Sequence, residues 1–163
     1  MLDRLHKAGW KRIGFYLPKV IDWRTAGAFS AAIWRWQQNL PEADHLEVGL
    51  PPGYDEEHFG EWFRRVRPQF LIGMPQPSMD WMKRAGIKPV PVAMPASLEP
   101  EEAPGITRVD ENWEAIYLGA VRLLDSMLRH GERGIPDSPR RTAIAGRWVP
   151  GQWGKGSATR GKS

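Results

Sequence analysis

The chain has 163 residues, a formal net charge of +4 and no cysteine, with 41% hydrophobic and 26% charged residues. This length accommodates one domain with its own hydrophobic core, and the composition excludes wholesale disorder. The lack of cysteine excludes a disulfide, a thiolate nucleophile and a cysteine-based zinc site. No run approaches the roughly 18 apolar residues of a membrane span, and residues 1–12 lack the apolar core of a signal peptide, so we expect a cytoplasmic protein.

The positive charge is concentrated near the C-terminal end of the chain. From Arg140 onward there are six basic residues and no acidic residue, so residues 1–139 carry 17 basic and 19 acidic residues, a net charge of −2. A nearly neutral body argues against nucleic-acid binding by the folded part. We interpret residues 151–163, which are rich in Gly, Ser and Lys, as a disordered basic tail.

The first predicted elements are a strand and a helix. Residues 12–17 (RIGFYL) form a short apolar run that is typical of a buried strand, and Pro18 ends it. Asp22 is a candidate cap for a helix predicted over 23–38, in which apolar residues recur at helical spacing before Pro41.

Two further strands and two helices are predicted in the middle of the chain. Residues 46–50 predict a weak strand, and residues 70–74 (FLIGM) predict the clearest buried strand. Between them, Asp55 caps a helix that ends before Pro68 and whose apolar face consists of Phe59, Trp62, Phe63 and Val66. A short helix over about 78–85 follows the second strand.

Residues 90–94 (VPVAM) predict another strand, at an edge or with an irregular start because Pro91 has no N–H donor. The elements predicted after it are a surface crossover over 95–104, a helix over about 110–130 capped by Asp110, and a strand over about 140–148. Strands alternating with helices at this spacing predict an α/β fold, in which a parallel sheet is flanked by helices on both faces.

The order of elements over 105–151 resembles the closing segment of the effector-binding domain in LacI/GalR-type transcription regulators. It comprises a short extended segment, a long apolar-periodic helix, the turn ERGIP and a β-like run that ends in GRWVPG. The motif GWKRIGF near the start and the run DWRTAGAFSAA at 22–32 also resemble that family. The resemblance covers about residues 5–150.

The resemblance implies a flavodoxin-like lobe of a periplasmic-binding-protein-like fold. Residues 1–150 would form the C-terminal lobe of a sensor domain, together with the returning helix 110–130. It also implies a sensor and not an enzyme, because the family binds small effectors such as sugars or nucleobases between two lobes. An effector shifts the equilibrium between lobe arrangements by its differential affinity for them. The expected partners are a small-molecule effector and a second copy in a homodimer; no cofactor or metal is expected.

The resemblance makes six residues candidates for effector contact: Arg24, Trp113, Glu111, Asp110, Asp22 and Gln76. Arg24 would reach the cleft from the head of its helix, where a guanidinium can bind vicinal hydroxyls or a carboxylate; the alternative is an ion pair with Asp22. Trp113 would stack on a sugar face, or pack in the core. Asp110 and Glu111 would be polar partners near the hinge, or only the helix cap and a favourable charge at the helix N-terminus.

Two departures from the family pattern weaken the expectation of a sugar. The family usually ends the strand matching 71–74 in a polar pair, whereas Pro75 and Gln76 follow it here. The family usually ends the strand matching 90–94 in an aspartate, whereas this chain has Pro95, which offers neither an acceptor side chain nor an N–H. The alternatives are a less hydroxylated effector and a pocket that no longer functions.

We expect DNA binding only through a helix-turn-helix that this chain does not contain, because eleven residues precede Arg12. In the family, the helix matching 110–130 packs on the sheet of the N-terminal lobe. Here we expect it either to refold onto the remaining lobe or to form a dimer contact. Its apolar stripe consists of Trp113, Ile116, Tyr117, Ala120, Val121, Leu124, Met127 and Leu128.

Catalytic chemistry finds little support in the motifs. The four histidines are scattered without metal-ligand spacing, and no GxSxG, GxGxxG or Walker-type motif follows a strand. Most of the nine tryptophans fall on apolar helix faces, which favours core packing over base stacking. The sequence therefore predicts effector sensing. The alternatives are a stand-alone, truncated interaction or dimerisation module without effector or DNA, and an α/β enzyme with an unrecognised site.

Overall fold

The computed structural model describes residues 1–97, 106–135, 138 and 141–151. The described elements in chain order are α1 (Leu2–Lys7), β1 (Ile13–Tyr16), α2 (Lys19–Arg24), α3 (Ala28–Gln37), the 3₁₀ helix η1 (Glu42–Asp44), α4 (Glu56–Val66), β2 (Phe70–Gly73), α5 (Pro75–Arg84), β3 (Val92–Ser97), β4 (Thr107–Asp110), α6 (Trp113–Arg129) and β5 (Arg147–Val149). Residues 98–104 of the predicted crossover and 152–163 of the predicted tail lie outside the described residues.

The described strands form one sheet in the order β1-β2-β3-β4-β5, in which β1 to β4 are parallel and β5 is antiparallel to β4. The predicted α/β fold is therefore confirmed. The strand predicted over 46–50 is reduced to one parallel bridge between Gly49 and Tyr16. Pro51 and Pro52, which follow, have no N–H to donate and so cannot extend the pairing. This segment still lies beside β1, which gives the strand order of a flavodoxin-like sheet.

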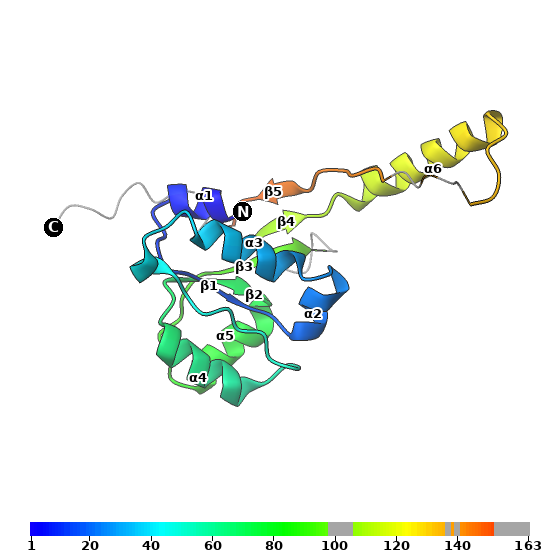
Figure 1. The fold of residues 1–163 in the computed structure, drawn as a ribbon. Coiled ribbons are helices and arrows are strands. Elements are labelled where there is room, and N and C mark those ends of the chain that lie inside the picture. The colour runs from blue at the N-terminus through cyan, green and yellow to red at the C-terminus, as the bar shows by residue number, and fades with distance from the viewer. Residues whose placement is uncertain (98–105, 136–137, 139–140, 152–163) are drawn as a thin grey trace.

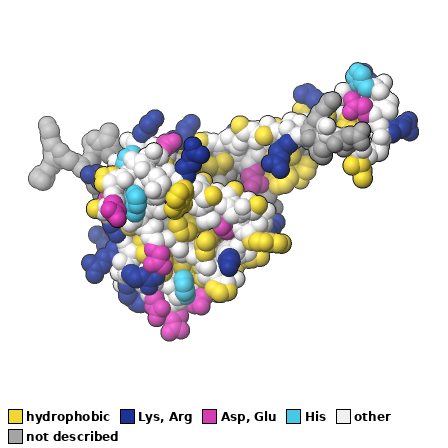
Figure 2. Space-filling view, viewed as in Figure 1, with side chains coloured by type: hydrophobic (Ala, Val, Ile, Leu, Met, Phe, Trp, Pro, Cys, Tyr) yellow, Lys and Arg dark blue, Asp and Glu magenta, His cyan; other side chains and the backbone are white. Residues whose placement is uncertain are grey.

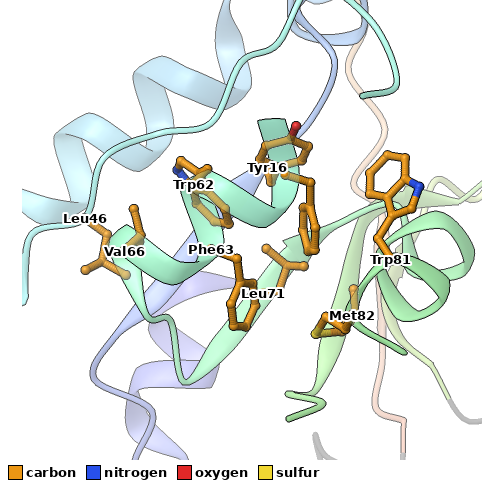
Figure 3. Packing of buried hydrophobic residues seen from close by; sticks show 10 residues of the cluster. Tyr16, Leu46, Trp62, Phe63, Val66, Leu71, Trp81 and Met82 are labelled. Carbon is orange, nitrogen blue, oxygen red and sulfur yellow. The ribbon is translucent and has the colours of Figure 1, made fainter. Parts of the chain in front are cut away.

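Helices cover both faces of the sheet, with α1 and α3 on one side and α4 and α5 on the other (Figure 1). On the second side, an aromatic cluster packs against the strands (Figure 3); its buried members are Tyr16, Leu46, Phe59, Trp62, Phe63, Val66, Leu71, Trp81, Met82 and Val92. The core on the first side consists of Leu5, Ile13, Phe15, Leu17, Ile33, Phe70, Ile72 and Ala93. Strands β1, β2 and β3 each contribute to both cores because successive side chains of a strand point to opposite faces.

The single helix predicted over 23–38 is wrong. The chain forms α2 and α3 instead, separated by a turn in which Ala26 and Gly27 have φ angles of 54° and 76°. Left-handed residues end a right-handed helix. Asp22 lies inside α2 and does not cap its start; its carboxylate accepts hydrogen bonds from the Ser30 backbone N–H (3.0 Å) and hydroxyl (2.6 Å) in the first turn of α3. Asp22 therefore joins the two short helices.

Pro91 and Pro95 do not place β3 at the edge of the sheet. β3 lies between β2 and β4, so the expectation of an edge strand is wrong. Pro91 immediately precedes the strand and needs no ladder donor there. The register of β3 against β4 shifts between Met94 and Ser97. Pro95 lies in this interval, and its missing N–H accounts for the irregularity.

Helix α6 projects away from the lobe, and none of its residues is buried (Figure 1). Residues 141–146 return beside it: a Cβ on Gly119 would lie 2.9 Å from the Ile144 Cδ1 atom. The expectation that this helix refolds onto the lobe is therefore wrong, while the dimer contact stays a prediction. Among the described helices, none is both long and apolar enough to cross a membrane.

Some tryptophans are buried and others are exposed, whereas the sequence predicts core packing for most of them. Trp62 and Trp81 are buried in the aromatic cluster, as expected for apolar helix faces. Trp23 and Trp34 are instead 77% and 64% exposed. The broken helix explains part of this difference, because Trp23 now belongs to α2 and its direction is independent of the apolar face of α3.

Candidate functional site

The carboxyl ends of β1 to β4 lie at one edge of the sheet because these strands are parallel. From β1 the chain moves to one side, toward segment 46–50, and then returns to the other side to form β2. The topological switch point therefore lies between the ends of β1 and β2, at Tyr16 and Gly73. In open α/β sheets, ligands bind outside the carboxyl ends of the strands at such a point.

Tyr16 and His58, which are not among the residues predicted from the sequence, form a polar contact at this edge. The Tyr16 hydroxyl donates to the Asp55 backbone carbonyl at 3.1 Å and lies 3.0 Å from the His58 Nδ1 atom. The hydroxyl has a single proton, so both contacts are hydrogen bonds at once only in the His58 tautomer that carries its proton on Nδ1. Burial raises the pKa of Tyr16 above its usual value, so the phenol stays neutral at physiological pH. No sequence signal marks this pair, since the two residues are 42 positions apart.

Arg24 is the last residue of α2, so its predicted position at the head of a helix is wrong. Its side chain is exposed and makes no hydrogen bond or ion pair within the described residues. The alternative ion pair with Asp22 is not formed, because the Asp22 carboxylate is 6% exposed and is bound by Ser30. Among the described residues, the Arg24 guanidinium therefore keeps its donors available, at the C-terminal end of α2.

Asp110 is the final residue of β4 and not the helix N-cap that the sequence predicts. The cap is Asn112, which has a φ angle of 61° and makes no side-chain capping bond. The Asp110 carboxylate accepts from the Asn112 N–H at 2.8 Å and from Arg147 Nη2 at 3.0 Å. These bonds hold its pKa below the usual range, chiefly through the Asn112 N–H. Asp110 thus ties β4 to β5, while Glu111 is half-buried and makes no such bond with the described residues.

We expect the substitution Asp110→Asn to destabilise the protein at neutral pH but not in strong acid. A carboxyl group with a lowered pKa in the folded state stabilises the fold above its ordinary pKa of 3.8, and this contribution is lost as the pH falls through the lowered value. Urea melts at pH 7 and pH 2 check this. The exposed Glu42 provides the control Glu42→Gln; an Asp110→Asn effect that is equal at both pH values contradicts the charge-based role.

Trp113 and Gln76 differ in whether their side-chain N–H groups already have an acceptor. The Trp113 ring is half-buried beside Tyr117, with 5.4 Å between ring centroids. Its Nε1–H is buried without an acceptor among the described residues, a situation that costs about 1–3 kcal/mol. Gln76 is exposed in the first turn of α5 and donates to the Asp80 carboxylate at 3.1 Å.

The six candidate residues therefore lie on three separate segments, which follow the carboxyl ends of β1, β2 and β4. No hydrogen bond or ion pair connects these three groups in the described part of the chain. Three of the residues use their polar groups inside the fold: Asp22, Asp110 and Gln76. The other three, Arg24, Glu111 and Trp113, have polar groups without a partner among the described residues. Within the described ranges, no cluster of three or more His, Asp or Glu side chains could hold a metal ion.

No protein-family model and no curated protein matches the chain. Solved structures do resemble it. A LacI-family transcriptional regulator from Silicibacter pomeroyi has a TM-score of 0.60 and 18% identity, covering 91% of this chain and 48% of its own. A PurR-family regulator from Vibrio parahaemolyticus has a TM-score of 0.57 and 15% identity, with 92% and 58% covered. An uncharacterized protein from Actinobacillus succinogenes has a TM-score of 0.62 and 16% identity, with 93% and 58% covered.

The chain thus spans about half the length of the solved structures that it resembles, 48–58% in these three cases. At this level of identity the likeness concerns the fold. The resemblance expected from the sequence is confirmed at that level: the chain has the periplasmic-binding-protein-like fold found in LacI-type and PurR-type regulators, over the part that corresponds to about half of such a protein.

Proposed function

We propose that residues 1–150 form the C-terminal lobe of an effector-sensing domain of a transcription regulator, with α6 as the returning helix. The observation that carries this proposal is the fold likeness to two such regulators across 91% and 92% of the chain. The lobe would supply one wall of a ligand cleft in a non-catalytic, cytoplasmic protein that acts as a homodimer. DNA contact would belong to a helix-turn-helix outside the 163 residues.

The free polar groups support a small effector that carries hydrogen-bond acceptors. Arg24 offers a complete guanidinium, which binds a carboxylate or a pair of hydroxyls through two parallel bonds. Trp113 offers a buried N–H that lacks an acceptor, beside an aromatic face that can stack on a ring. Glu111 offers an acceptor for a ligand hydroxyl. In this proposal Asp22, Asp110 and Gln76 shape the wall and make no strong ligand contact, since their polar groups are already bonded.

The proposal predicts saturable binding that depends on Arg24. We would titrate the ¹⁵N-labelled chain with D-glucose, D-ribose, adenine and guanine and follow the amide shifts by NMR. We expect at least one probe to shift residues near the ends of β1 and β4. Arg24→Ala should weaken this binding about 10- to 100-fold, because a hydrogen bond to a charged group contributes about 1.5–3 kcal/mol.

The matched control is Arg35→Ala, since Arg35 is also exposed but lies on α3, away from the sheet edge. An equal loss of affinity in both variants would show non-specific charge attraction. A lack of saturation with all four probes would remove the support for these effector classes.

The second candidate function is a stand-alone interaction or dimerisation module, favoured by the exposed apolar side chains of α6. The two functions make opposite predictions. Saturable small-molecule binding supports the sensor, whereas a robust dimer that binds none of the probes supports the module. The intact mass of the protein captured from its source cells adds an independent check: a species near twice 18.5 kDa supports a complete regulator.

A further inference from the structure

The imidazole ring of His58 is held in place at the switch point between β1 and β2. The Tyr16 hydroxyl oxygen lies 3.0 Å from the His58 Nδ1 atom and 3.1 Å from the Asp55 backbone carbonyl. The Asp55 carboxylate accepts from the His58 backbone N–H at 3.0 Å, which caps α4. Both the backbone and the ring of His58 are therefore fixed relative to the end of β1.

These contacts favour one tautomer of the neutral His58 ring. If Nδ1 carries the proton, it donates to the Tyr16 hydroxyl, whose own proton goes to the Asp55 carbonyl. If Nε2 carries the proton, the Tyr16 proton goes to Nδ1, and two oxygen atoms face each other across 3.1 Å without a proton between them. Tyr16 is 2% exposed, so its hydroxyl depends on these protein partners. The Nδ1–H tautomer satisfies both contacts and the Nε2–H tautomer only one, which stabilises the former.

The other ring nitrogen of His58 is open to solvent. His58 is half-exposed, and its Nε2 atom is not buried and has no hydrogen bond to the described residues. Water can serve Nε2 in either tautomer, so the contact at Nδ1 decides between them. In the favoured tautomer Nε2 has no proton and presents its lone pair outward as an acceptor.

This acceptor lies at the edge of the sheet where a ligand is expected. Tyr16 is the last residue of β1 and pairs with Gly73, the last residue of β2. Segment 46–50 runs parallel to β1 through the bridge between Gly49 and Tyr16. Helix α4 follows that segment and therefore begins at the same carboxyl edge, with His58 in its first turn. Ligands of open α/β sheets bind outside this edge.

Acceptors are scarce among the other groups that could contact a ligand there. Pro75 follows β2 and Pro95 lies in β3, and a proline side chain cannot accept a hydrogen bond. The guanidinium of Arg24 and the indole N–H of Trp113 are donors only. His58 Nε2 thus supplies a kind of group that Arg24 and Trp113 cannot supply.

The charges around His58 favour a ligand group that donates over an anionic one. Figure 2 shows acidic side chains gathered over the end of the lobe that α4 forms. Glu56 is neutralised by Arg84 at 2.6 Å, whereas Asp55 and Glu57 are exposed and have no ion pair among the described residues. This negative charge repels a carboxylate or phosphate group and tolerates a hydroxyl or an amine.

We propose that Tyr16 holds His58 as its Nδ1–H tautomer, so that His58 Nε2 accepts a hydrogen bond from a hydroxyl or amine group of the effector. Tyr16 is then a positioning residue, since the partner of one ring nitrogen sets the state of the other. The ligand contact rests on the proposed function, whereas the tautomer does not.

The tautomer is tested first, by long-range ¹H–¹⁵N NMR correlation of the histidine rings at about pH 8, where an ordinary imidazole is mostly neutral. Protonated and bare ring nitrogens have distinct ¹⁵N shifts. We expect His58 to carry its proton mainly on Nδ1. Tyr16→Phe keeps the aromatic ring in the core and removes the hydroxyl, so the Nδ1–H fraction should fall in this variant. Circular dichroism verifies that the variant is folded.

The ligand contact is tested by titrating the chain with D-glucose, D-ribose, adenine and guanine at the same pH. His58→Asn keeps an amide N–H near the position of Nδ1 and has no atom at the position of Nε2. We expect it to weaken the binding of a saturating probe about 2- to 10-fold, the effect of one neutral hydrogen bond. The matched control is His45→Asn, because His45 precedes segment 46–50 and lies at its opposite end.

The outcomes separate this inference from the proposed function. A His58 ring that is mainly Nε2–H in the wild-type chain overturns the proposal whatever binds. Equal affinity of the wild type and His58→Asn for a saturating probe overturns the ligand contact and leaves the proposed function standing. If no probe saturates while His58 is Nδ1–H, the ligand contact falls together with the effector classes of the proposed function, and the positioning by Tyr16 stands.

Discussion

Replacement of Trp62 by alanine is expected to lower the free energy of unfolding by about 3–5 kcal/mol, the usual cost of truncating a buried large aromatic side chain. Trp62 is 0% exposed at the centre of the aromatic cluster between α4 and the sheet (Figure 3). Its ring lies 5.1 Å from Tyr16 and 6.2 Å from Phe59, measured between centroids. The substitution also removes the hydrogen bond from the Trp62 Nε1–H to the Glu47 carbonyl, at 3.0 Å.

Urea denaturation followed by circular dichroism measures this loss. The matched control is Trp34→Ala, which removes the same side chain from α3, where it is 64% exposed. We expect the control to change stability by no more than about 0.5 kcal/mol. Similar losses for the two variants would mean that the aromatic cluster does not dominate the stability of the lobe.

The second large effect is expected from Gly73→Ala, with a loss of about 1–3 kcal/mol or more through overpacking. Gly73 is the last residue of β2 and pairs with Tyr16 at the end of β1. A Cβ at this position would lie 2.7 Å from the Tyr16 backbone oxygen. A side chain could turn away from such a contact, but a backbone oxygen within a sheet cannot. The two strands would have to separate at the switch point itself.

The control for this substitution is Gly53→Ala, because a Cβ on Gly53 has no heavy atom within 4 Å. Its midpoint in urea should stay the same or rise slightly, since alanine reduces the conformational entropy of the unfolded chain. The Gly73→Ala midpoint should fall by about 1 M in urea, given a slope of roughly 1–3 kcal/mol per molar. An unchanged midpoint for Gly73→Ala would show that the ends of β1 and β2 are not in tight contact.

Local sequence patterns were sufficient to predict the helices and strands whose buried residues recur at a regular spacing. The four residues predicted to share the apolar face of α4, Phe59, Trp62, Phe63 and Val66, are all buried on one face of the sheet. The apolar runs at 12–17 and 70–74 contain β1 and β2, which pair with each other in parallel. In these elements each residue's environment follows from the period of the helix or strand, which can be read from neighbouring residues.

The candidate site was harder to predict from the sequence. Its location at the carboxyl edge follows from the alternation of strands and helices, but the state of each side chain does not. Asp22 resembled a helix cap for the residues after it, and only the turn at Ala26 brought Ser30 back to its carboxylate. Gly27 was a sequence sign of this turn, but the left-handed conformation of Ala26 was not predictable, because alanine rarely adopts a positive φ. The partner of Asp110 is Arg147, 37 positions away on an antiparallel strand.

The sequence by itself determined the α/β alternation, the apolar faces that make the two cores, and the amphipathic stripe of α6. It could do so because burial of one face imposes a regular spacing on residues that are close along the chain. Only the tertiary structure decided which polar groups are already bonded, that Tyr16 meets His58, and that no residue of α6 is buried among the described residues. These outcomes depend on which distant segments come together, and short-range spacing carries no record of that choice.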